Sequence, residues 1–254
     1  SDDKTKIVGI LDQICEDKLE PFIESSYQKL ANYVSAYEQK MIMKRENIAD
    51  RGIWTAKKRY ILNVWDSEGV RYSEPKLKIM GIEAVKSSTP GPCRTKIKDA
   101  LKIMMTGVED DVIDFIDNFR KEFKQLPPED IAFPRSVSNV TKYKSVNSIY
   151  DKGTPIHARG ALLFNHHIKR LGLENKYSPI QNGEKIKFCY LKVPNPIHEN
   201  VISFISSFPV ETGLHKFIDH ELQFEKSFLD PLKIILEVIG WNVEKQSSLE
   251  SFFG

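Results

Sequence analysis

The sequence predicts an α+β protein, because stretches with the apolar spacing of helices alternate with short β-prone runs. Apolar residues recur at every third or fourth position over residues 7–37, which predicts a long amphipathic helix, and again over residues 224–239. Residues 60–65 and 76–80 are rich in β-prone residues around a turn signal at 66–69, which predicts a short antiparallel unit. The 254 residues suffice for one large domain or two small ones, each with its own core.

Prolines mark the boundaries of the helices expected in the first half of the chain. Pro21 lies inside the first helix and is expected to kink or split it near residues 18–20, because proline lacks the amide donor that continues the hydrogen-bond ladder. Ser87-Ser-Thr-Pro90 places a hydroxyl cap before a proline at a first helical position, so a helix is expected from there toward Met105. Another helix is expected over about residues 108–126.

The second half of the chain has a mixed pattern. The prolines within residues 126–135 predict an irregular connector, because proline breaks both helices and central strands. Residues 156–171 then suit a helix, and residues 185–191 and 201–208 suit strands. The amphipathic helix over residues 224–239 completes the predicted fold.

Cysteine usage and hydropathy exclude several classes of protein. Cys15, Cys93 and Cys189 are widely spaced and form no CxxC pair, so we expect reduced thiols and neither a disulfide framework nor a zinc site. The apolar runs are far shorter than the roughly 20 residues of a membrane helix. The N-terminal Ser-Asp-Asp-Lys has no basic and then apolar stretch of a secretory signal. We therefore expect no membrane partner and a cytoplasmic location.

The net charge of +2 hides an uneven distribution along the chain. Residues 54–104 carry 11 Lys and Arg against 5 Asp and Glu, and residues 135–192 carry 11 against 3. Acidic residues are in excess in each of the three segments around these blocks. Basic blocks of this kind are typical of a surface that follows the phosphates of a nucleic acid. Random clustering on a solvated surface is the alternative.

A run of cations beside an aromatic residue lies in the first basic block, at Lys57, Lys58, Arg59 and Tyr60. Three cations next to an aromatic ring at the mouth of a strand suit the neutralisation of phosphates and packing against a sugar or base. The plain alternative is an exposed, solvated strand end.

The C-terminal tail fits the pattern QxxLxxFF through Gln246, Leu249, Phe252 and Phe253. One short turn brings the leucine and the two phenylalanines to the same side, where they form an apolar plug for a pocket on a partner. The alternative is that the phenylalanines pack onto their own domain, although terminal residues usually fray. The tail resembles a sliding-clamp-binding peptide, so a sliding clamp is an expected partner.

The run from Trp54 to Asp66, continued by residues 74–81 and 87–90, resembles the palm-to-thumb junction of B-family replicative DNA polymerases of T-even-type bacteriophages. Lys58-Arg59-Tyr60 matches that family's KxY motif, whose lysine and tyrosine hold the primer–template duplex near the primer end. Later segments resemble parts of the thumb that grip the minor groove and backbone of the duplex. They contain the other expected DNA-contacting residues, which are Asn139, Lys142, Tyr143, His157, Arg159, Lys185 and Lys226.

The resemblance covers nearly the whole chain and implies three parts: the C-terminal palm segment over residues 1–86, the thumb over 87–245 and the clamp-binding peptide over 246–254. The family's polymerase centre holds two metal ions on aspartates of DxxSLYP and YxDTDS motifs, and neither string occurs here. We therefore expect no metal ligands in this chain and Mg²⁺ in the palm of a partner. Residues 48–54 are shorter than the family's glycine-rich loop, which leaves the contact of this loop with the primer open.

The function implied by the resemblance is that of a C-terminal subunit or fragment of a DNA-directed DNA polymerase, a nucleotidyltransferase. The chain would grip primer–template DNA, tether the enzyme to the sliding clamp, and be active only with an N-terminal chain that carries exonuclease, fingers and palm aspartates. The first helix would pack on the palm sheet of that partner, so the isolated chain is expected to expose apolar surface. Both a naturally split subunit and an excised fragment fit the sequence. The alternative function is a free-standing, non-enzymatic DNA-binding adaptor of the sliding clamp.

Overall fold

The computed structural model describes residues 2–138, 140–145 and 148–245. Helices and two small antiparallel sheets make up the fold, which confirms the predicted α+β class. The chain divides into two compact units, residues 1–80 and 81–254, and each is described by itself. Within the described residues, no helix is both long enough and apolar enough to cross a membrane.

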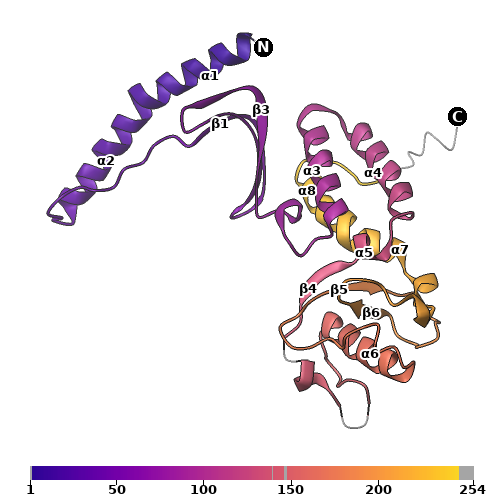
Figure 1. Ribbon diagram of the computed structural model, residues 1–254. Helices are drawn as coiled ribbons and strands as arrows, with labels where there is room; N and C mark the ends of the chain where they lie inside the picture. Colours follow the sequence, from indigo (N-terminus) through magenta and orange to yellow (C-terminus); the bar gives the residue numbers. More distant parts are fainter. Residues whose placement is uncertain (1, 139, 146–147, 246–254) are drawn as a thin grey trace, which may run out of the picture. The chain divides into compact units, whose positions relative to one another are not determined.

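The first unit begins with a long helix (Figure 1), one turn of which is a wider π-helical turn. Helix α1 (Asp2–Ile14) continues through a π-helical segment (Cys15–Leu19) into α2 (Glu20–Tyr33). The expected interruption before Pro21 is therefore a π-helical segment, which accommodates a proline that lacks the amide donor of a regular helix. The helix ends earlier than the predicted Tyr37, and Ser35 then adopts a positive φ of 53°.

Three antiparallel strands follow, in the order β1-β2-β3. They are β1 (Asn47–Ala56), β2 (Arg59–Ser67) and β3 (Val70–Met80). The last two confirm the predicted antiparallel unit. The first strand was not predicted, because its residues 49–52, Ala-Asp-Arg-Gly, have low β propensity and its pairing with β2 is interrupted by register shifts.

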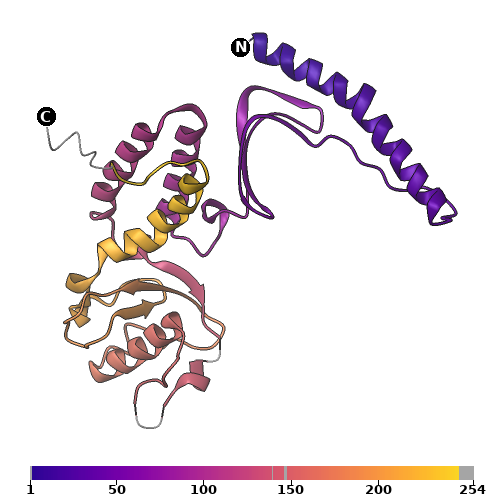
Figure 2. The same cartoon turned by 180° about the vertical axis from the view of Figure 1, so that it is seen from behind.

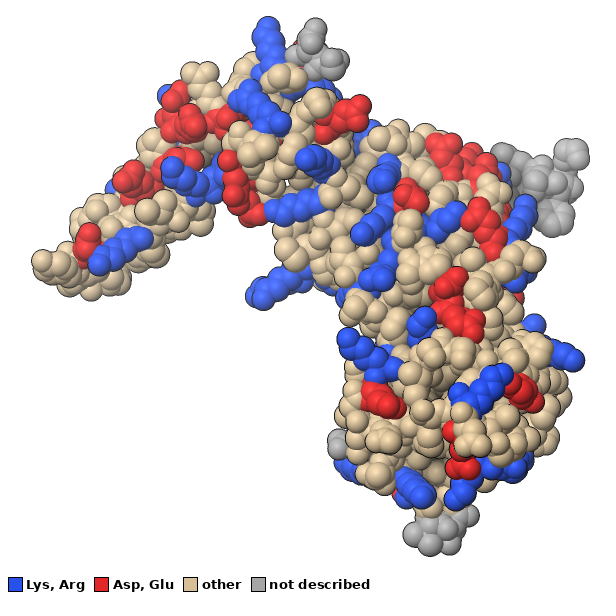
Figure 3. Space-filling model, viewed as in Figure 1, with Lys and Arg blue, Asp and Glu red and all other residues tan. Residues whose placement is uncertain are grey.

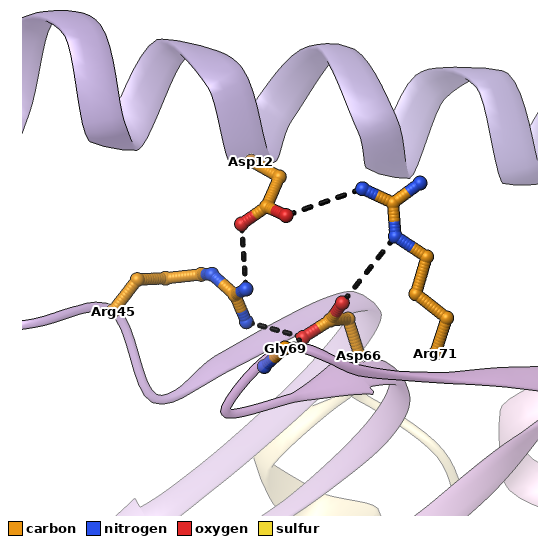
Figure 4. Close-up of polar contacts among 5 residues, drawn as sticks. All are labelled: Asp12, Arg45, Asp66, Gly69 and Arg71. Atoms are coloured by element: carbon orange, nitrogen blue, oxygen red, sulfur yellow. Dashed lines mark hydrogen bonds and ion pairs between the residues drawn. The ribbon is translucent and has the colours of Figure 1, made fainter.

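A network of four charged side chains ties α1 to the β2–β3 hairpin (Figure 4). The Arg45 guanidinium donates hydrogen bonds to both Asp66 and Asp12. Arg71 donates to Asp12 at 3.1 Å and lies 3.6 Å from the fully buried carboxylate of Asp66, which also accepts from the Gly69 amide at 3.0 Å. The hydrogen bond from Arg45 is the main cause that lowers the pKa of Asp12 below its ordinary value.

The second unit contains a helical layer and a three-stranded sheet (Figures 1 and 2). After a 3₁₀ turn (Glu83–Val85) come α3 (Gly91–Thr106), α4 (Glu109–Phe123) and the short α5 (Pro128–Ile131). The predicted hydroxyl cap of α3 is wrong, because the residue before the helix is Pro90 and no side chain caps it.

The second sheet has the order β4-β5-β6 and is antiparallel throughout. Its strands are β4 (Phe133–Ser136), β5 (Lys185–Tyr190) and β6 (Val201–Phe204). The prediction of an irregular connector over residues 126–135 is therefore wrong, since the segment forms α5 and most of β4. The sheet tolerates Pro134 because β4 is an edge strand, where a missing amide donor can face away from the ladder.

Helices cover both faces of this sheet (Figures 1 and 2). Helix α6 (Ile156–Arg170) packs on one face, mainly against β6. On the other side lie α3, α4 and a C-terminal helix that runs from α7 (His220–Phe224) through a π-helical segment (Glu225–Leu229) into α8 (Asp230–Val238). The aromatic rings of Phe119 and Phe228 pack edge to face, with their centroids 4.8 Å apart, and join α4 to this last helix. Further 3₁₀ turns lie at Val140–Tyr143, Val210–Thr212 and Leu214–Phe217.

Replacing Arg45 by methionine is expected to lower the free energy of unfolding of the first unit by about 2 kcal/mol or more, because Asp66 stays buried without its main cationic partner. Tryptophan fluorescence during urea unfolding measures this in a Trp241→Phe background, since Trp54 and Trp65 both lie within residues 1–80. The control is Lys40→Met: Lys40 and its partner Glu38 have side chains 78% and 57% exposed, so the loss should stay below about 0.5 kcal/mol. Equal losses in the two variants would contradict the structural role of the network.

His167 is expected to make the second unit less stable as the pH falls. Its side chain is buried in α6, and burial, with the charges of Arg170 and His166, lowers its pKa from 6.5 to about 4. Between these values the unfolded chain binds a proton that the folded chain does not, so stability should fall by at most about 1.4 kcal/mol per pH unit and be unaffected by this group above pH 6.5. Urea unfolding followed by circular dichroism at several pH values should show a flatter profile for His167→Leu than for the unchanged chain, and equal profiles would contradict this role of His167.

Candidate nucleic-acid interface

The cation-rich run lies at the turn between β1 and β2 in the first unit. Ala56 pairs with Arg59, so Lys57 and Lys58 form a two-residue turn, and both side chains are exposed. Within the described part of the chain, neither of these two lysines has an ion pair. Figure 3 shows Lys and Arg side chains projecting from this end of the sheet. Phosphates of a nucleic acid can therefore approach the two ammonium groups without displacing an internal partner.

Lys58 holds an unusual backbone conformation at this turn. Its φ is 62°, in the left-handed region that favours glycine or asparagine and costs other residues about 1 kcal/mol or more. Thr55 supports the turn by donating its hydroxyl to the Arg59 carbonyl oxygen at 3.3 Å. Strain of this kind often occurs at functional sites, because the residue type is kept for its side chain and not for its backbone.

Four segments of the second basic block lie next to one another in the second unit. They are the loop after β4, the turn that leads into β5, the residues around Tyr150 and the first turn of α6. The loop after β4 is bonded to the turn before β5: the Val140 amide donates to Asn182 Oδ1 at 2.6 Å, and the Val137 amide donates to the Glu184 carbonyl oxygen at 3.0 Å. Lys185, the first residue of β5, pairs with Ser136 of β4. These bonds bring the segment of Lys142 and Tyr143 beside the segment of Lys185.

The first turn of α6 joins the same group. The Arg159 guanidinium lies over the Tyr150 ring at 5.7 Å from its centroid and donates a hydrogen bond to Asn200. The adjoining Asp151 amide donates to the Tyr143 carbonyl oxygen at 3.0 Å. His157 lies near Arg135, and its pKa is lowered by burial and then by that guanidinium. The predicted residues brought together are Lys142, Tyr143, His157, Arg159 and Lys185.

Part of the positive charge in residues 135–192 is used inside the protein. Arg135 donates to the Ser88 carbonyl oxygen at 2.7 Å, Lys187 donates to the Glu129 carbonyl oxygen at 2.8 Å, and Lys176 forms an ion pair with Glu211. The lysines that stay exposed in this block include Lys142, Lys144, Lys152, Lys169 and Lys185. In the second unit, the face seen in Figure 3 carries both signs of charge. The sequence count therefore overstates the charge available to a ligand.

The other predicted site residues do not join this group. Lys226 lies on the π-helical segment of the last helix, where it forms ion pairs with Asp230 at 2.9 Å and Glu225 at 3.1 Å. Lys57, Lys58, Arg59 and Tyr60 belong to the first unit. Asn139 and the tail residues Gln246, Leu249, Phe252 and Phe253 lie outside the described residues.

The described residues contain no group of three or more His, Cys, Asp or Glu side chains placed to hold a metal ion. Their arrangement instead offers cations, amides and aromatic rings, which are groups that contact phosphates and sugars.

The chain is similar to nucleotide-polymerising enzymes of bacteriophages. No family model matches it. It is 32% identical over 269 residues to the DNA-directed DNA polymerase of Enterobacteria phage T4, a match that covers 99% of this chain and 29% of that protein. It is 34% identical over 260 residues to the DNA-directed DNA polymerase of Escherichia phage RB69, covering 97% of this chain and 28% of that protein.

These two matches confirm the resemblance to T-even-type phage DNA polymerases. The chain spans less than a third of the length of the curated relatives that it matches.

Changing Lys58 to glycine is expected to raise the stability of the first unit by up to about 1 kcal/mol, because glycine adopts a positive φ without strain. The matched control is Lys57→Gly, which removes the same charge at a residue whose φ is not positive and should lower stability by about 0.5–1 kcal/mol. Urea unfolding in the Trp241→Phe background measures both. A loss of stability in both variants would show that the backbone of Lys58 is not strained.

Proposed function

We propose that this chain is the part of a replicative phage DNA polymerase that grips primer–template DNA and tethers the enzyme to a sliding clamp. The observation that carries the proposal is the match to two DNA polymerases over 97–99% of this chain and only 28–29% of each relative. In this proposal residues 1–86 are the end of the palm, residues 87–245 are the thumb, and residues 246–254 are the clamp-binding peptide.

Within this proposal the chain binds and positions DNA, and a partner performs the chemistry. Lys57 and Lys58 neutralise backbone phosphates near the primer end, and Tyr60 packs beside them. The group around Lys142, Arg159 and Lys185 holds the duplex farther from the primer end. The partner polypeptide supplies exonuclease, fingers and the palm aspartates that bind Mg²⁺, because neither of the family's aspartate motifs occurs in this sequence.

The long N-terminal helix supports the need for a partner. Of its described residues only Val8 and Ala31 are buried, although the helix carries an apolar stripe. The exposed members of the stripe on α1 are Ile7, Ile10, Leu11 and Ile14, and on α2 they are Phe22, Leu30 and Tyr33. Their exposed fractions of 41–87% are unusual for large apolar side chains that follow one another along a helix. We propose that the rest of the polymerase, which makes up over two thirds of each relative's length, covers this stripe.

Primer extension by the partner polypeptide is expected to require this chain. The extension rate should rise when the purified chain is added, and the double variant Ile10→Glu/Phe22→Glu should lose that effect by at least about tenfold, because two charges cannot be buried at an apolar interface without a large cost. The matched control is Gln28→Glu, which adds a charge to α2 outside the stripe. Extension that is identical with and without the chain would exclude the polymerase function and favour the free-standing adaptor.

Deleting residues 249–254 is expected to abolish stimulation by the sliding clamp and to leave distributive synthesis unchanged, because the apolar plug is lost while the DNA-binding residues remain. The lengths of extension products, measured with and without clamp, test this. Replacing Glu250 and Ser251 by alanine is the control, since neither belongs to the QxxLxxFF pattern. If the deletion lowers both kinds of synthesis equally, the tail has a structural role and the clamp tether is refuted.

A further inference from the structure

An apolar row crosses the exposed face of the first sheet next to the cationic turn. Trp54 of β1 is directly opposite Tyr60 of β2, and Tyr60 is directly opposite Met80 of β3. Directly opposed residues of antiparallel strands share one face of the sheet. Trp54 is 61% exposed and Met80 is 44% exposed. The side chains of Trp54 and Tyr60 therefore lie next to each other on the same face, within reach of one ligand.

The backbone around Trp54 makes room for its indole. A Cβ atom added at Gly52 would lie 2.6 Å from two carbons of the indole ring and 2.8 Å from a methyl carbon of Leu62. One part of the ring thus lies against the glycine, beside Leu62, and the rest is open to solvent. A register shift between Trp54 and Ala56 separates this residue from the turn that carries Lys57 and Lys58. Bulges of this kind redirect side chains next to functional sites.

The row and the turn together match the chemistry of a DNA strand. Sugars and phosphates alternate along the backbone, so an apolar contact beside two cations complements both groups. We propose that Trp54 packs against a deoxyribose of the primer–template duplex, next to a phosphate neutralised by Lys58. This inference rests on the proposed function and adds to it a contact that contributes affinity without releasing counterions.

Salt dependence separates the two kinds of contact. The test is fluorescence anisotropy of a fluorescein-labelled primer–template duplex titrated with the chain at several salt concentrations. Trp54→Ala is expected to weaken binding about 5- to 20-fold and to leave the slope of log affinity against log salt unchanged. Lys58→Ala is expected to reduce that slope by about one. Trp54→Phe should retain most of the affinity, because a smaller aromatic ring still packs on a sugar.

The matched control is Val70→Ala, because Val70 is 60% exposed at the β2–β3 turn, at the other end of β2. Thermal unfolding of Trp54→Ala checks that the sheet is intact. An affinity of Trp54→Ala equal to that of Val70→Ala, with a reduced slope for Lys58→Ala, overturns the role of Trp54 and leaves the proposed function standing. Absence of salt-dependent duplex binding by the unchanged chain overturns both.

Discussion

The buried carboxylate of Asp66 is the constraint on which the first unit depends. An uncompensated charge at a fully buried position is costly, so Arg45 and Arg71 must both reach it, and through Asp12 they fix helix α1 against the hairpin. The helix itself contributes little burial to this unit. The position of α1 on the hairpin, and with it the direction of its apolar stripe, thus depends on one small electrostatic network.

The sequence predicted the elements whose signals are local. The apolar spacing of residues 156–171 and the β-prone residues of 60–65 were sufficient, because each element carries the pattern of its own buried face. Strand β1 and strand β4 were missed for a different reason. Strand β1 pairs with β2 across a two-residue turn, but its residues 49–52 have low β propensity and give no strand pattern. Strand β4 pairs with β5, which is distant in sequence, and its edge position makes Pro134 acceptable.

For the candidate site, the sequence predicted the types of residue present, but it did not predict which contacts most of them make in the folded protein. The cation-rich turn and the segments around Lys142, Arg159 and Lys185 were visible in the sequence as charge and as motif. No sequence signal showed that Arg135 and Lys187 donate to carbonyl oxygens, because such contacts depend on the packed backbone. The ion pair of Lys226 with Asp230, by contrast, follows from their i,i+4 spacing on one helix. Trp54 was visible in the same motif, but only the register with Tyr60 reveals their shared face.

The π-helical turn at Cys15–Leu19 also determines the directions in which the apolar stripes of α1 and α2 face. In an uninterrupted α-helix, 100° per residue would place the stripe of Phe22, Leu30 and Tyr33 roughly 100° around the axis from that of Ile7 and Ile14. A π-turn contains about one residue more than an α-helical turn, so the helix after it is rotated back by a similar angle. This rotation returns both stripes to the same side. One nearly flat partner surface can then cover the apolar stripe along the whole helix. In a chain shortened by a single residue at this point, the stripe would wind around the helix axis.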